Sequence, residues 1–166
     1  QFCFEAKEKK YKFQFVEELS IVPLFKRKEP KHGVLFIAKF FGGGSGTRSL
    51  ITIWRYSMED KRFINLLPTI AITEQGEYKI LSNMKNGLDG VLVTADYIWA
   101  EGETHFAPHK YKISIFQYDE EKKIFKSAGE YATKTKYKSL DDVNKIDVIR
   151  HEIRNIQKFI SNNKTK

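Results

Sequence analysis

The chain contains two closely similar stretches, ITIWRYSMEDKRF at 51–63 and ISIFQYDEEKKIF at 113–125. Six of the thirteen aligned positions are identical, at an offset of 62 residues. A second match precedes them, because GVLFIA at 33–38 returns as GVLVTA at 90–95, at an offset of 57 residues. Internal similarity at such a spacing is typical of repeated supersecondary units. We therefore predict that the chain contains a duplicated unit.

Both copies have the pattern of antiparallel β-structure. The runs at 33–41 and 90–99 are rich in β-branched and aromatic residues, and residues 110–118 alternate between apolar and polar. Polar segments at 57–60 and 119–122 predict short hairpin connections. The expected fold is therefore mainly β, an antiparallel meander of about ten strands, bent or folded into a sandwich because so many strands rarely stay flat. Its two blade-like repeats are expected at 33–81 and 90–140.

The rest of the chain is expected to complete a single domain over 1–166, because its length is close to that of one average domain. Residues 1–32 are predicted to supply an N-terminal strand and a basic turn. At 139–161, isoleucine and valine recur three and four residues apart, which predicts an amphipathic α-helix. Ser139 and Asp142 resemble a capping box at its start. We expect the apolar stripe to cover the sheet; a partner helix is the alternative.

Composition narrows the classes of function. With 29 Lys and Arg against 21 Asp and Glu, the net charge is +8, which favours an anionic partner or ligand. No run approaches the ~18 apolar residues of a membrane span. The single cysteine, Cys3, excludes an internal disulfide and a zinc site built from several thiolates. The start at Gln1 favours a mature exported protein, periplasmic or secreted, over a cytoplasmic one.

The loops in which the two copies differ are the first candidates for a functional site, because binding residues often lie on loops of a shared scaffold. The first copy has a glycine-rich loop ending in Arg48, which lacks the lysine of a phosphate-binding loop. The second copy has an insertion at 100–109 with carboxylate and imidazole side chains. If its first half is extended, three of these side chains share one face and suit a divalent metal such as zinc. The candidate residues of a ligand or partner surface are Arg48, Glu101, Glu103, His105 and His109, and the last four are also the candidate metal ligands.

Three function classes follow from these features. The leading hypothesis is a non-enzymatic, exported binding module that holds an unknown protein or anionic ligand through its loops, without a cofactor. An inhibitor or immunity-type envelope protein has this size and charge. The first alternative is a metal-binding protein or hydrolase that uses the loop from Glu101 to His109, because no other catalytic signature is present. The second is a nucleic-acid-binding domain that uses the basic patch of Lys134, Lys136 and Lys138.

Overall fold

The structure is a computed structural model of the chain. Its backbone is described except at 1, 7–8, 14, 26–30, 42–46, 68–70, 75, 82–89, 105–106, 120, 139–146 and 164–166. Side chains are described at 50–67, 76–81, 90–104, 107–119, 121–138 and 147–162.

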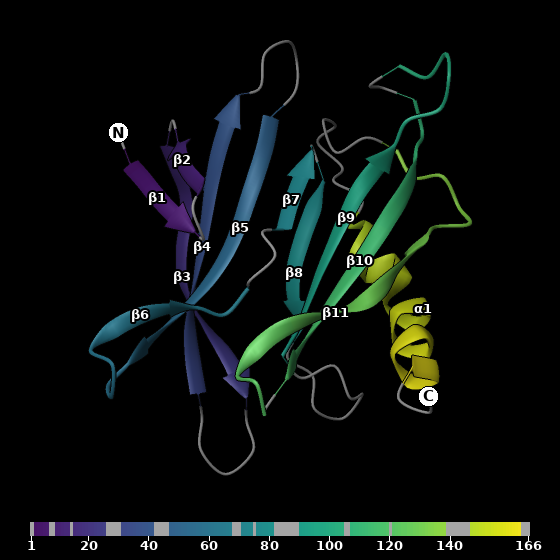
Figure 1. Cartoon of the computed structure of the whole chain (residues 1–166). Helices are drawn as coiled ribbons and strands as arrows, with labels where there is room; N and C mark the ends of the chain where they lie inside the picture. The colour runs from purple at the N-terminus through teal and green to yellow at the C-terminus, as the bar shows by residue number, and fades with distance from the viewer. Residues whose placement is uncertain are drawn as a thin grey trace. The chain divides into compact units, whose positions relative to one another are not determined.

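The described chain is mainly β, with one helix at its C-terminal end (Figure 1). The elements are β1 (Phe2–Ala6), β2 (Lys9–Phe13), β3 (Phe15–Phe25), β4 (Lys31–Phe41), β5 (Thr47–Ser57), β6 (Arg62–Asn65), β7 (Ala71–Glu74), β8 (Glu77–Leu81), β9 (Val91–Ile98), β10 (Lys110–Asp119), β11 (Ile124–Ala132) and α1 (Val148–Asn163).

These elements divide between two compact units. The first comprises Gln1–Glu74 and Tyr118–Lys126, and the second comprises Gln75–Gln117 and Ser127–Lys166. The tip of the β10–β11 hairpin therefore belongs to the first unit, while the rest of both strands belongs to the second. The expected single domain over 1–166 stays a prediction.

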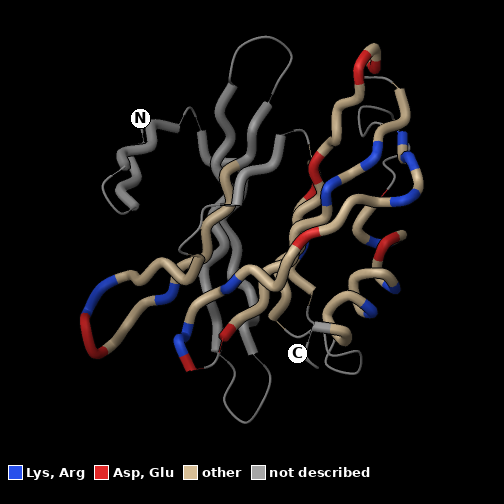
Figure 2. The backbone as a smooth tube through the Cα atoms, turned by 45° about the vertical axis from the view of Figure 1, so that its right-hand side comes forward, with Lys and Arg blue, Asp and Glu red and all other residues tan. Residues whose placement is uncertain are grey.

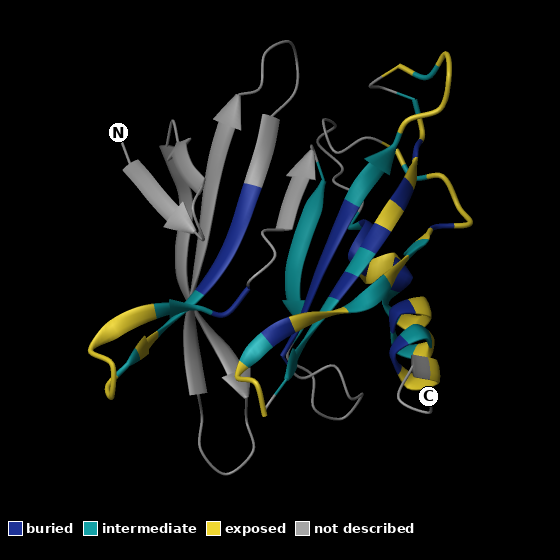
Figure 3. Cartoon of the chain, viewed as in Figure 1, coloured by how far each residue is buried: buried dark blue, intermediate teal, exposed yellow. Residues whose placement is uncertain are grey.

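The first unit contains two sheets. β1 pairs with β2, and a larger sheet has the order β3-β4-β5-β6, with β7 also pairing with β5. β6 and β7 pair with separate stretches of β5, at Trp54–Ser57 and Arg48–Ile51 respectively. Four consecutive residues of β5, from Leu50 to Ile53, are buried (Figure 3). β5 is thus covered on both faces there, because a strand with one solvent-exposed face would alternate between buried and exposed residues.

The second unit contains a four-stranded antiparallel sheet in the order β11-β10-β9-β8. Tyr111, Ile113 and Ile115 of β10 are buried while Lys110 and Lys112 are exposed, which confirms the predicted alternation. β8 holds the segment expected to close the first repeat, yet it pairs with β9. The described strands therefore form three sheets, in place of the single ten-stranded meander predicted from the sequence.

The C-terminal helix lies against the sheet of the second unit (Figure 1). Ile149, Ile156 and Ile160 are buried in one cluster with Val93 and Ile113 of the sheet. The described part of the apolar stripe thus completes the core, as expected. Complete burial of such a side chain contributes about 1.5–3 kcal/mol, so burial of this stripe stabilises the docked helix.

The start of α1 differs from the prediction. α1 begins at Val148, and Asp147 is its N-cap, since its Oδ1 accepts a hydrogen bond from the Arg150 N–H at 2.9 Å. Glu77 of β8 accepts the N–H groups of Val148 and Ile149 at 2.9 and 3.1 Å. The predicted capping box at Ser139 and Asp142 lies outside the described residues. A carboxylate from the neighbouring strand therefore binds the helix start, a contact that local sequence does not reveal.

The two predicted hairpins have matching geometry. Lys61 follows the turn after β5 with φ 52°, and Lys123 follows the turn after β10 with φ 55°. The aromatic pair beside each turn is also arranged alike. The ring centroids of Tyr56 and Phe63 are 5.3 Å apart, and those of Tyr118 and Phe125 are 5.4 Å apart. Both turns thus use a left-handed residue after the polar segment, as in hairpins built around a type I turn.

Basic and acidic side chains are interspersed in the part of the chain whose side chains are described (Figure 2). Figure 2 shows Lys and Arg residues on the β5–β6 hairpin, on the strands of the second unit and on α1, with acidic residues among them. Among the described residues, no helix has the length and apolar character needed to span a membrane.

Candidate functional site

His109 is the last residue of the loop that sequence analysis selected. It immediately precedes β10, and its backbone N–H and C=O both pair with Tyr137, at 2.7 Å each. Its side chain is fully buried. Its ring stacks on that of Tyr97, with centroids 4.7 Å apart and planes inclined by 18°. Backbone pairing and ring stacking together hold this imidazole in one position.

Glu103 holds His109 from the loop side. Its Oε2 lies 2.9 Å from His109 Nδ1, and its Oε1 accepts a hydrogen bond from Lys136 Nζ at 2.6 Å. These bonds, first that from Lys136 and then that from His109, lower the pKa of Glu103 to about 2. An ionised carboxylate only accepts, so Nδ1 of His109 carries the proton. His109 Nε2 is buried with no hydrogen-bond partner in the described part of the chain.

Trp99 packs against both His109 and Tyr97 and reaches solvent. Its ring centroid is 4.9 Å from that of His109 and 5.8 Å from that of Tyr97, and the residue is 47% exposed. The indole is thus held against fixed rings while half of it faces water. We call Tyr97, Trp99, Glu103, His109 and Lys136 the His109 corner.

The structure brings together only part of the predicted metal site. Residues 100–103 form a turn, in which the Glu103 N–H donates to the Ala100 C=O at 3.1 Å and Gly102 has φ 78°. The chain is therefore not extended at Glu101 and Gly102, which was the condition for one face shared by three side chains. Glu101 is exposed in this turn. Across the described residues, no three His, Cys, Asp or Glu side chains gather as a metal site.

Two predicted site residues fall outside the described side chains. Arg48 lies in β5, where its backbone pairs with Phe40 and Glu74, but its side chain is not described. His105 is outside the described residues altogether. The functional roles suggested for Arg48 and His105 therefore stay predictions.

The predicted basic patch divides between different surroundings. Lys134, Lys136 and Lys138 are all exposed in the segment after β11. Lys136 binds Glu103, whereas Lys134 lines a pocket beside α1. Lys136 is thus engaged by a carboxylate, and the nucleic-acid interface at these three lysines stays a prediction.

A second polar site lies between β11 and α1, and sequence analysis missed it. Glu152 of α1 is only 3% exposed. Its Oε2 accepts hydrogen bonds from Tyr131 Oη at 3.0 Å and Asn155 Nδ2 at 2.8 Å, and its Oε1 accepts one from Tyr137 Oη at 2.7 Å. Burial and the Glu152 carboxylate raise the pKa of Tyr137 to about 12 and also raise the pKa of Tyr131.

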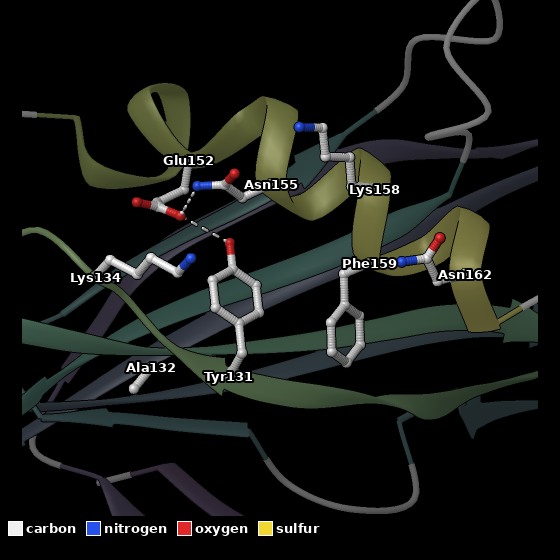
Figure 4. A pocket seen from close by; sticks show the side chains of 8 residues that line it. All are labelled: Tyr131, Ala132, Lys134, Glu152, Asn155, Lys158, Phe159 and Asn162. Atoms are coloured by element: carbon white, nitrogen blue, oxygen red, sulfur yellow. Dashed lines mark hydrogen bonds between the residues drawn. The ribbon is translucent and has the colours of Figure 1, made fainter.

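A pocket with a volume of about 280 Å³ opens beside this carboxylate (Figure 4). We call it the Glu152 pocket. Its lining comprises Tyr131, Ala132, Lys134, Glu152, Asn155, Lys158, Phe159 and Asn162. The only sequence signal was a polar residue inside the helical region, which does not distinguish a buried carboxylate from a solvated one.

Comparison with known proteins adds little to this geometry. No protein-family model matches the chain, and no curated protein matches it significantly. Among solved structures, the chain is similar to one described as "Crystal structure of CarG", with a TM-score of 0.49 and 12% identity. The match covers 75% of this chain and 88% of that chain. A likeness this weak supports no statement about function.

Proposed function

We propose that the chain is a non-enzymatic binding module that holds a protein or an anionic ligand through the His109 corner. The observation that carries the proposal is Trp99, which is half exposed while its ring rests on the fixed rings of His109 and Tyr97. An immobilised aromatic side chain loses little conformational entropy when a partner covers it. Tryptophan is also among the residues that most often dominate binding energy at interfaces.

The hydrogen bonds of the corner support binding over catalysis. Glu103 is bound by both His109 and Lys136, so its carboxylate is engaged in holding the loop. Lys134 and Lys138 add positive charge in the neighbouring segment. A partner with an acidic rim around an apolar contact would complement this surface.

The experiment tests whether a partner attaches at Trp99, with a second exposed apolar residue, Met58, as the comparison. Immobilised wild-type protein, Trp99→Ala and Met58→Ala are incubated with native extract and with heparin as a polyanion probe. Met58 is 81% exposed on the β5–β6 hairpin and serves as the matched control. We expect a bound species that Met58→Ala retains and Trp99→Ala loses. Equal retention by all three proteins would contradict the proposal.

We further propose that the scaffold arose by duplication. The matched hairpins, with Lys61 and Lys123 in the same left-handed conformation, support this view. The antiparallel orders β4-β5-β6 and β9-β10-β11 support it as well. The shared core of each repeat would then be these three strands, while β8, at the end of the first repeat, pairs with β9 of the second.

An exported site of action belongs to the same proposal, as expected for an inhibitor or immunity-type protein of the envelope. The size and the net charge of +8 fit an inhibitor or immunity-type protein, the class for which export is expected. Fractionation of cells that produce the full gene product tests it, since a purely cytoplasmic protein would contradict export.

Metal binding is the second candidate, and one observation favours it. His109 Nε2 is buried without a described partner while Nδ1 is held by Glu103, an arrangement that orients imidazole ligands in metal sites. Titration with zinc would test it. His109→Gln should then abolish stoichiometric binding while His151→Gln, an exposed control on α1, should not.

A further inference from the structure

The Glu152 pocket contains a buried carboxylate with no direct ion pair among the described residues. All three hydrogen-bond donors to Glu152 are neutral, two phenol hydroxyls and one amide. Among the described residues, Glu152 forms no ion pair. A buried charge is costly unless it is paired, so a cationic group that reaches this carboxylate would be strongly favoured.

The rim of the same pocket is positive. Lys134 and Lys158 both line it, both are exposed, and neither has a described ion-pair partner. The pocket therefore presents one carboxylate and two ammonium groups. The complementary ligand carries the opposite set, one ammonium group and two carboxylates.

The arrangement of these groups sets the shape of the ligand. In Figure 4, Glu152 and Lys134 lie at the same end of the pocket, Asn162 lies at the other, and the rings of Tyr131 and Phe159 lie between them. Lys158 leaves α1 on the side away from these rings, with its Nζ directed toward the Glu152 end (Figure 4). The two rings have centroids 5.6 Å apart and provide an apolar wall. An ammonium and a carboxylate on one carbon would match Glu152 and Lys134. A short carbon chain would carry the second carboxylate, which the exposed side chain of Lys158 would turn to meet.

We propose that the Glu152 pocket binds an α-amino dicarboxylate of the glutamate type, with its ammonium group on Glu152 and its carboxylates on Lys134 and Lys158. The volume of about 280 Å³ lies near the lower end for ligand pockets, as suits so small a molecule. Charge-assisted hydrogen bonds at both ends provide the affinity. The pocket shares Lys134 with the surface of the proposed binding function but does not involve Trp99, so loss of L-glutamate binding and loss of the Trp99-dependent partner are separate outcomes.

The first test is calorimetric titration of the full chain with L-glutamate at low salt and neutral pH. L-glutamine lacks the second carboxylate and glutarate lacks the ammonium group. We expect each analogue to bind at least about tenfold more weakly, because each loses one charge-assisted contact. Absence of saturable binding up to about 10 mM L-glutamate, or equal affinity for all three compounds, would overturn the proposal.

The second test places the ligand in this pocket with matched variants. Lys158→Met should weaken L-glutamate binding about tenfold. Arg154→Met, which removes an exposed cation of the same helix outside the pocket lining, should leave it unchanged. Lys134→Met and Lys138→Met form a second pair of the same kind. Equal losses within each pair would indicate attraction by net charge alone and contradict the site.

Glu152→Gln tests the role of the buried carboxylate. It should weaken binding of L-glutamate but not of glutarate, because only L-glutamate brings an ammonium group. Equal weakening of both would contradict the assigned orientation. If the variant fails to fold, the exposed lysine pairs still decide, since they lie outside the core.

Discussion

At the scale of single residues, Glu103 determines how the His109 corner is held. Its two carboxylate oxygens bind Lys136 and His109, and Oε2 also accepts the Ala100 N–H at 3.2 Å. The loop is thus fastened to three points by one side chain. Protonation of that side chain would weaken all three contacts together.

The carboxyl group of Glu103 should therefore titrate at an unusually low pH. A carboxyl whose pKa is lowered on folding contributes stability that is present above its unfolded value and lost as pH falls through its folded value. For Glu103 that window runs from the ordinary 4.5 down to about 2. We expect the NMR shift of the Ala100 amide to titrate with a midpoint near the lower value.

Lys136→Met provides the control for that titration. Removal of the largest stabilising contact should raise the midpoint toward the ordinary value. A wild-type midpoint already at the ordinary value would show that the corner is not held in this way.

Tyr137 should titrate at unusually high pH. Its hydroxyl donates to Glu152 at 2.7 Å, and burial with this carboxylate raises the pKa of Tyr137 to about 12. Stability is then complete below the unfolded pKa of 10.0 and is lost as pH rises through the folded value. The ring carbon shift of Tyr137, followed by NMR, measures this. Glu152→Gln should lower the pKa toward its ordinary value, and no change in that variant would contradict the assigned contact.

At the scale of elements, the hairpins concentrate backbone strain at two lysines. Lys61 and Lys123 have positive φ, which costs a side-chain-bearing residue about 1–2 kcal/mol. Glycine removes that cost but adds unfolded-state entropy worth about 0.5–1 kcal/mol.

Lys61→Gly and Lys123→Gly should therefore each stabilise the protein, by about 0.5 kcal/mol. Urea unfolding measures the difference. Lys122→Gly is the matched control, because Lys122 precedes the strained position and is not among the residues with positive φ. It should destabilise the hairpin, and equal effects at positions 122 and 123 would contradict this account.

Periodic features of the elements could be predicted from sequence. β10 and α1 each bury one face against the core, and this produces the alternation of Tyr111, Ile113 and Ile115 and the isoleucine stripe of the helix. The helix start could not be predicted, since Glu77, which binds it, lies 71 residues before Val148. The sequence also gave no indication that β8 would pair with β9.

The contacts of the two candidate sites also differ in whether a local sequence pattern could suggest them. Glu103 and His109 are six residues apart, so a loop hypothesis placed them together. Lys136 joins them across 33 residues, and Tyr131 meets Glu152 across 21. These contacts depend on how α1 and the segment after β11 dock on the sheet. No local pattern encodes that docking.

At the scale of the whole molecule, both candidate sites lie in the second unit. Tyr137 links them, since its backbone pairs with His109 while its hydroxyl binds Glu152. The first unit instead presents the exposed side chains of Tyr56, Met58 and Phe63 on the β5–β6 hairpin. The account therefore assigns partner recognition to the second unit, with the hairpin as the comparison surface.

Photo-crosslinking from position 99 tests that assignment most directly. A photoreactive phenylalanine analogue replaces Trp99 in one protein and Met58 in another, and both are irradiated in native extract. The account predicts a discrete crosslinked product from position 99 that excess wild-type protein suppresses and that position 58 does not yield. No product from position 99, or the same product from both positions, would contradict it.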